Sequence, residues 1–196
     1  MPGPVHHSHS VFFVRAVGLG DQLAALAPDR AVVSAIRAQA LLGADAPAES
    51  FDEARRAVEL APGDHHAQQL LAMAAWRTGR LGMAQESFQR AIGLSLRLPS
   101  LLAEYAWFMA AERGPKLAEQ AARDAVEADA ESSTAWAALG LAQYRLHRRK
   151  EAEECLQKAL RLNPNDIYAQ SAMVTLLQDQ HQDGQAEALA GLLEEH

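Results

Sequence analysis

The sequence predicts an all-α protein built from about five helical hairpins that recur with a 34-residue period. Three observations predict this fold. Alanine, which loses almost no side-chain entropy in a helix, supplies 41 of the 196 residues. Small residues recur at one spacing along most of the chain, and glycine and proline turns fall between the helical segments.

The clearest unit runs from residue 133 to residue 166. Its apolar and small residues are spaced for two successive helices, and a proline follows the second one. The first helix carries Trp136, Leu139, Gly140 and Tyr144; the second carries Ala152, Leu156 and Ala159; the proline is Pro164.

A fixed 34-residue step carries this pattern along the chain without any insertion. The corresponding small residues are Ala118, Ala84 and Ala186 for Ala152; Ala125, Ala91 and Ala57 for Ala159; and Ala106, Ala72 and Ala38 for Gly140. Pro62 lies three periods before Pro164. Two antiparallel helices cross closely only where the contact lacks bulky side chains, so these columns predict tight hairpins that stack on their neighbours. The expected units are residues 31–64, 65–98, 99–132, 133–166 and 167–196.

The expected turns agree with this division. Glycines at Thr78-Gly79-Arg80, Arg113-Gly114-Pro115 and Asp183-Gly184 separate the two helices within a unit. Prolines in residues 61–64 and 163–166 separate one unit from the next, because proline cannot continue a helix interior.

The 34-residue spacing and the W-x2-LG pattern at Trp136 to Gly140 resemble the tetratricopeptide repeat family. The resemblance covers about residues 31–196 and implies a right-handed superhelical solenoid. The pattern is weaker in the first unit, which has Arg37 and Ser50, and in the last, which has Val174. We therefore expect looser packing at both ends. Residues 1–30 are expected to form a partly ordered N-terminal extension, with Asp21 to Ala27 as a remnant half-repeat.

The resemblance implies a partner-binding groove lined by the first helix of each unit, and a protein or peptide partner in it. The implied groove residues are His66, Gln69, Met73, Trp76, Arg77, Ala103, Trp107, Ala137, Leu141, Tyr144, Arg145 and Tyr168. The aromatic members would form a track beside the two arginines, and such side chains dominate binding hot spots. The alternative is that these rings pack between adjacent helices. Trp136 is expected to be structural. Members of the family that clamp a terminal carboxylate are similar to one another in using lysine and asparagine at set groove positions. Such a clamp is not expected here, because the only asparagines, Asn163 and Asn165, lie in a turn.

Composition argues against several other functions. A net charge of −7 disfavours nucleic-acid binding, and the one basic run, residues 145–150, is interpreted as a solvated turn. The single cysteine, Cys155, falls in a helical apolar pattern and is expected to be buried and inert. No stretch reaches the roughly 18 apolar residues of a membrane span.

No arrangement of residues predicts catalysis, a cofactor or a functional metal. The histidines at positions 6, 7, 9, 65 and 66 are interpreted as adventitious metal binders at most. Carboxylates such as Glu53, Glu104 and Glu119 occur at helical spacing and are expected on solvated faces.

The sequence therefore predicts a non-catalytic scaffold that holds a peptide or helix of a partner protein. The excess of arginine over lysine, 15 to 3, suggests a high-GC genome. A bacterial origin and a cytoplasmic location are expected. A fragment of an anchored or larger protein is also consistent with the sequence. Two alternatives stay open: a substrate-recruiting or regulatory arm of a larger enzyme, and a self-associating scaffold whose apolar residues 11–14 dock into a neighbouring molecule.

Overall fold

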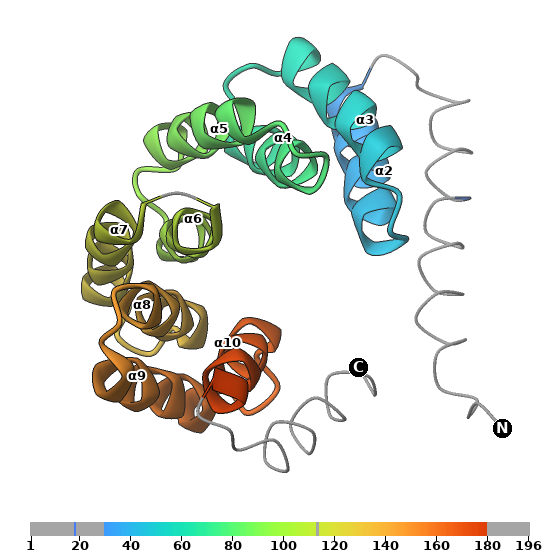
Figure 1. The fold of residues 1–196 in the computed structure, drawn as a ribbon. Coiled ribbons are helices and arrows are strands. Elements are labelled where there is room, and N and C mark those ends of the chain that lie inside the picture. Colours follow the sequence, from blue (N-terminus) through green and yellow to red (C-terminus); the bar gives the residue numbers. More distant parts are fainter. Residues whose placement is uncertain (1–17, 19–29, 113, 180–196) are drawn as a thin grey trace, which may run out of the picture. The chain divides into compact units, whose positions relative to one another are not determined.

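The computed structural model describes residue 18 and residues 30–112 and 114–179. This part of the chain is helical throughout and holds no β-strand (Figure 1). The first helices of the hairpins are α2 (Ala31–Gly43), α4 (His65–Arg77), α6 (Pro99–Glu112), α8 (Ser133–Arg145) and α10 (Ile167–Asp179). The second helices are α3 (Pro47–Leu60), α5 (Leu81–Leu94), α7 (Pro115–Ala128) and α9 (Arg149–Leu162).

The helices recur with the predicted period. The first helices begin at Ala31, His65, Pro99, Ser133 and Ile167, with the same step between each start and the next. The second helices keep this step from Pro47 to Arg149. The predicted all-α helical repeat solenoid is confirmed.

The chain forms two compact units, Met1–Arg97 and Leu98–His196. In the first, α2 pairs with α3 and α4 with α5, and α4 also packs on α3. In the second, α6, α8 and α10 lie on the inner side of a curve, with α7 and α9 on its outer side (Figure 1). The predicted extension, including residues 11–14, and the second helix of the fifth unit lie outside the described residues, apart from Gly18 and Arg30.

The small-residue columns lie where the helices of a hairpin cross. Ala38, Ala72 and Ala106 are fully buried. At the fourth crossing even alanine would not fit, because a Cβ on Gly140 would lie 2.7 Å from Leu156 Cγ and 3.1 Å from the Ala152 carbonyl oxygen. The sequence argument for close crossings is confirmed at these positions.

The turns within the first, second and fourth hairpins share a positive φ at one position. Asp45, Gly79 and His147 occupy equivalent positions and all have positive φ, at 58°, 75° and 63°. Residues with a side chain are strained in the left-handed region, and glycine is not. Gly79, in the second repeat, is therefore the least strained of the three.

Two of the turns between repeats are capped by an aspartate, Asp64 or Asp166. The Asp64 carboxylate accepts a hydrogen bond from the main-chain N–H of His66 at 2.9 Å, at the start of α4. Asp166 is buried and accepts from the N–H groups of Tyr168 and Ala169 through Oδ1. Its Oδ2 accepts from the hydroxyls of Ser133 and Thr134, at 2.5 and 2.9 Å, so one carboxylate ties the start of α10 to the start of α8.

The polar residues of the first hairpin are accommodated by pairing. Arg37 Nη1 donates to Glu53 Oε1 at 2.5 Å, and the buried Ser50 hydroxyl donates to the Ala38 carbonyl at 2.8 Å. Both contacts join α2 to α3, so polar bonds replace part of the usual apolar packing there.

The expectation that the scattered carboxylates lie on solvated faces is wrong for Glu119. Its side chain is only 9% exposed, and Oε1 accepts from Arg123 at 2.5 Å and from Arg148 at 2.6 Å. Arg148 is 29 residues from Glu119 in the sequence and lies in the turn between α8 and α9. The packing of α8 on α7, which carries Glu119, brings the two side chains together. Part of the basic run at 145–150 is therefore an inter-helix contact and not simply a solvated turn.

Candidate functional site

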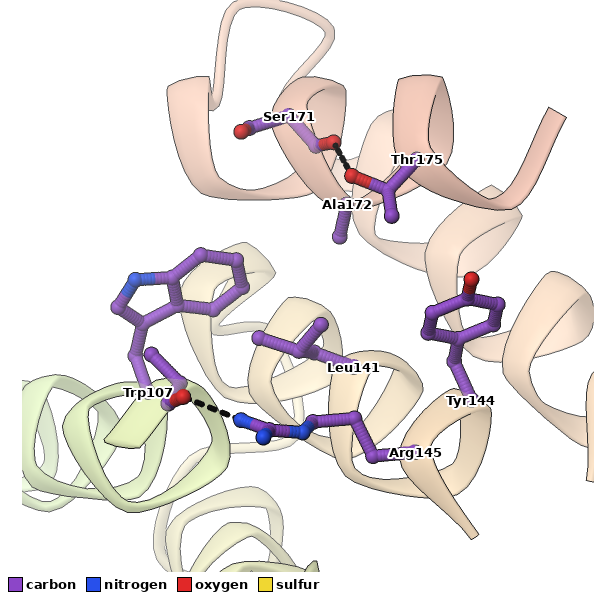
Figure 2. A pocket seen from close by; sticks show the side chains of 8 residues that line it. Trp107, Leu141, Tyr144, Arg145, Ser171, Ala172 and Thr175 are labelled. Atoms are coloured by element: carbon purple, nitrogen blue, oxygen red, sulfur yellow. Dashed lines mark hydrogen bonds between the residues drawn. The ribbon is translucent and has the colours of Figure 1, made fainter. Parts of the chain in front are cut away.

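A pocket of the compact unit Leu98–His196 lies among the first helices of three successive repeats. It has a volume of about 340 Å³. Its lining residues are Trp107 and Ala111 of α6, Leu141, Tyr144 and Arg145 of α8, and Ser171, Ala172 and Thr175 of α10. We call it the Trp107 pocket. Leu141 lies between the rings of Trp107 and Tyr144, and all three side chains extend toward α10 (Figure 2).

The apolar wall of the Trp107 pocket is held by an aromatic contact. The rings of Trp107 and Tyr168 pack with their centroids 4.9 Å apart and their planes tilted by 49°. A tilted pair at this distance is favourable and fixes both rings. Trp107 therefore presents a positioned ring to the pocket, while Tyr168 contributes to that position from α10.

The polar edge of the pocket is provided by Arg145. Its Nη1 donates to the carbonyl oxygen of Ala110 at 2.7 Å and also to that of Ala111 (Figure 2). Both acceptors are neutral, and Arg145 forms no ion pair with any described residue. The guanidinium charge at the pocket edge is thus oriented but not neutralised by a carboxylate.

A smaller cavity of about 170 Å³ adjoins this edge. It shares Tyr144 and Arg145 with the Trp107 pocket and is completed by His147, Arg149 and Asp179. Arg149 pairs with Asp179. Two arginines, one of them paired with an aspartate, therefore lie beyond Tyr144 on the described surface.

The structure brings together some of the groove residues implied by the sequence. Trp107, Leu141, Tyr144 and Arg145 line the Trp107 pocket, and Tyr168 contacts one of them. Ala103 and Ala137 are buried, so neither offers its side chain to a partner. Both remain part of the helices that carry the pocket.

The implied groove residues of the second repeat lie along α4. Gln69, Met73 and Trp76 are half-buried, as is His66, whose Nδ1 lies 3.4 Å from Gln69 Oε1. Arg77 donates to the Leu42 carbonyl at 2.8 Å and pairs with Asp45. These contacts tie α4 to the end of α2.

Sequence reasoning did not single out Ala172, His147 or Arg149 for the site. Ala172 lines the pocket, but its small apolar side chain gave no indication in the sequence that it belongs to a binding site. His147 and Arg149 were set aside with the basic run, because sequence spacing does not show that the turn after α8 adjoins the pocket.

Trp136 and Cys155 have the structural roles expected of them. The indole N–H of Trp136 donates to the Ala130 carbonyl at 2.8 Å, in the turn before α8. Cys155 is buried, and its thiol donates to Gln143 Oε1 at 3.1 Å. Burial, and then the negative charge of Glu154, raise the pKa of the Cys155 thiol to about 11. A thiol with this pKa is a poor nucleophile near neutral pH.

Two further properties concern possible membrane and metal roles. Within residues 30–112 and 114–179, no helix combines the length and apolar character needed to cross a membrane. In the same ranges, no three potential metal ligands of the His, Cys, Asp or Glu type lie together.

Comparison with known families identifies the repeat. Models described as Tetratricopeptide repeat match residues 133–166 and 65–97, which are the fourth and second units deduced from the sequence. The chain is a tetratricopeptide repeat protein. The resemblance inferred from the repeat period is thereby confirmed. A search of curated protein sequences finds no match to the chain.

Solved structures agree with the tetratricopeptide fold. YrrB, described as a TPR protein with an unusual peptide-binding site, is 19% identical, with a TM-score of 0.63 over 82% of this chain and 83% of its own. TTC0263, a thermophilic TPR protein of Thermus thermophilus, is 17% identical, with a TM-score of 0.71 over 85% and 91% of the two chains. A chain of the APC/C hetero-tetramer Cut9-Hcn1 is 19% identical, with a TM-score of 0.74 over 92% of this chain and 36% of its own. At these identities the likeness concerns the fold alone.

Proposed function

We propose that this tetratricopeptide repeat protein is a non-catalytic scaffold that holds a peptide or helix of a partner protein in the Trp107 pocket. The observation that carries the proposal is that three successive first helices converge on one apolar hollow of about 340 Å³. Hollows of this size, mostly apolar with a few polar groups, are typical binding sites.

The chemistry of the lining favours a partner with a bulky apolar side chain. Trp107 and Tyr144 offer large rigid rings, which lose little entropy on binding, and Leu141 extends the apolar surface between them. Arg145 provides an oriented cation at the edge, suited to a carbonyl or carboxylate of the partner. In the compact unit Met1–Arg97, we separately propose partner-binding roles for residues of α4: His66, Gln69, Met73, Trp76 and Arg77.

The comparisons lend support by analogy. YrrB is described as having a peptide-binding site, and Cut9 and Hcn1 are components of a hetero-tetramer. The fold shared with them is compatible with a partner protein as the ligand. It supports neither a nucleic-acid partner nor an enzymatic role.

The test begins with a pull-down using the full chain, followed by affinity measurements with each retained partner. Trp107→Ala should weaken capture by roughly tenfold or more, the loss expected for a hot-spot aromatic. Helical circular dichroism should remain unchanged. Leu117→Ala is a matched control, because Leu117 is an exposed apolar residue on the outer helix α7. If affinity survives both Trp76→Ala and Trp107→Ala, the first helices of the repeats do not bind the partner.

The two alternatives suggested by the sequence have their own tests. The length of the natural reading frame distinguishes a free scaffold from a substrate-recruiting arm of a larger enzyme. Self-association through residues 11–14 requires a change in solution mass when residues 1–20 are deleted. A cytoplasmic location is likewise part of the proposal and can be checked by fractionation.

A further inference from the structure

A second pocket lies in the compact unit Met1–Arg97, on helices that do not contribute to the Trp107 pocket. It has a volume of about 420 Å³ and is lined by Val58, Pro62, Gln68, Arg90, Gly93 and Leu94. These residues come from α3, the turn after it, α4 and the end of α5. We call it the Gln68 pocket.

Gln68 gives this pocket an acceptor with no partner. Its side chain is buried, with the residue only 3% exposed, and its Oε1 makes no hydrogen bond with any residue that the structure describes. Such buried acceptors are normally satisfied, because leaving one unpaired is costly. Gln170, three repeats later, also has an unpaired Oε1, while its Nε2 donates to the Pro164 carbonyl at 2.8 Å.

The opening beside Gln68 is due to a departure from the repeat pattern. Gly93 occupies the position of Glu59, Glu127 and Arg161 in the other units, all of which have long side chains. A Cβ added to Gly93 would meet no atom within 4 Å, so no close approach of helices requires glycine here. Glycine within a helix lowers its stability, and its visible effect at this place is to leave the pocket open.

Arg90 and Leu94 define the rim. They lie one helical turn apart on α5, Leu94 is exposed, and Arg90 is exposed without an ion pair to any described residue. The pocket thus combines apolar walls, one buried acceptor and one unpaired cation.

From this combination we infer that the Gln68 pocket binds a peptide segment of a partner protein in which tryptophan or tyrosine precedes an acidic residue. The ring fills the apolar space between Val58, Pro62 and Leu94. Its N–H or O–H donates to Gln68 Oε1, and the acidic side chain pairs with Arg90. This site is independent of the Trp107 pocket.

The test is an NMR titration of the full, isotope-labelled chain with the peptide acetyl-Trp-Glu-Glu-amide. We expect saturable shifts of the Val58, Gly93 and Leu94 amides and of the Gln68 side-chain amide. Acetyl-Phe-Gln-Gln-amide, which lacks the donor and the charges, should bind roughly tenfold more weakly or worse.

Paired variants separate binding from folding. Gly93→Leu should fill the pocket and abolish the shifts, whereas Gly93→Ala should keep them. An added Cβ meets no atom within 4 Å, and circular dichroism of both variants, compared with the parent, shows whether each remains folded. Gln68→Met should weaken binding of the peptide. Gln170→Met, the same change at the equivalent position of the fifth repeat, should not. Shifts confined to the Trp107 pocket, equal binding of the two peptides, or undiminished binding to Gly93→Leu would overturn the inference.

Discussion

Arg145 caps a helix of the preceding repeat: its Nη1 donates to the carbonyl oxygen of Ala110 at 2.7 Å, close to the end of α6. Arg77 makes the same contact with the carbonyl of Leu42, at 2.8 Å and close to the end of α2. The donor and acceptor are separated by 35 residues in both cases. The last carbonyls of a helix lack intrahelical partners and carry its negative dipole end, so a cation suits them.

Replacing this arginine should loosen the contact between neighbouring repeats. Arg145→Ala should lower the free energy of unfolding by about 1–2 kcal/mol, because hydrogen bonds from a charged donor are lost at a partly exposed site. Urea unfolding followed by circular dichroism measures it. Lys116→Ala, at an exposed lysine on α7, should stay within about 0.5 kcal/mol of the parent. Equal effects of the two changes would exclude a capping role.

Gly140 should tolerate no side chain. Gly140→Ala forces a methyl group against Leu156 and the Ala152 carbonyl. Overpacking costs about 1–3 kcal/mol, and the better helix propensity of alanine returns about 1 kcal/mol. We expect a net loss of up to about 2 kcal/mol in unfolding free energy.

A double-mutant cycle tests the cause of that loss. Leu156→Ala reproduces the smaller residue Ala122 of the preceding repeat, so Gly140→Ala should be nearly neutral in that background. The same glycine-to-alanine change at Gly93, where there is open space, should stabilise the protein instead. A loss at Gly140 that persists without Leu156 would mean that backbone contacts alone are responsible.

Cys155 should be unreactive in the folded protein and should make stability fall at high pH. Because burial raises the pKa of its thiol to about 11, the folded state retains a proton that the unfolded state loses above pH 9.0. This contribution is fully present below pH 9.0 and disappears as the pH rises to about 11. Two pKa units correspond to roughly 2–3 kcal/mol.

The measurement compares urea unfolding of the parent and Cys155→Ala across this pH range. The parent should lose more stability than the variant between about pH 9 and 11. Alkylation by iodoacetamide at neutral pH should be slow until denaturant is added. A stability difference independent of pH would show that the thiol is not held protonated by the fold.

Gly79 and Gly82 should respond in opposite directions to the same substitution. Gly79 has a φ of 75°, where alanine is strained, so Gly79→Ala should destabilise the protein by about 1–2 kcal/mol. Gly82 lies in the first turn of α5 with nothing within 4 Å of an added Cβ, so Gly82→Ala should be neutral or stabilising by up to about 1 kcal/mol. Thermal unfolding of the two variants provides the comparison, and a shift of the same sign in both would contradict the backbone argument.

Features that depend on local sequence were predictable. Helix starts, the breaks at Gly79 and Pro164, and the small residue at Gly140 follow from helix propensity, backbone conformation and the volume allowed at a crossing. These effects act within a single hairpin. Periodicity then repeats them along the chain, which is why the sequence alone was sufficient for the fold class and the family.

Features that depend on how one hairpin packs on the next came only from the tertiary structure. The contact of Trp107 with Tyr168, the two arginines on Glu119 and the unpaired oxygen of Gln68 each depend on the position of another helix. Spacing identifies the face of a helix to which a residue belongs, but not the distance to side chains in other repeats. Those distances are set by the packing angle between repeats, which is the sum of many small side-chain contacts, and that angle decided where the pockets form.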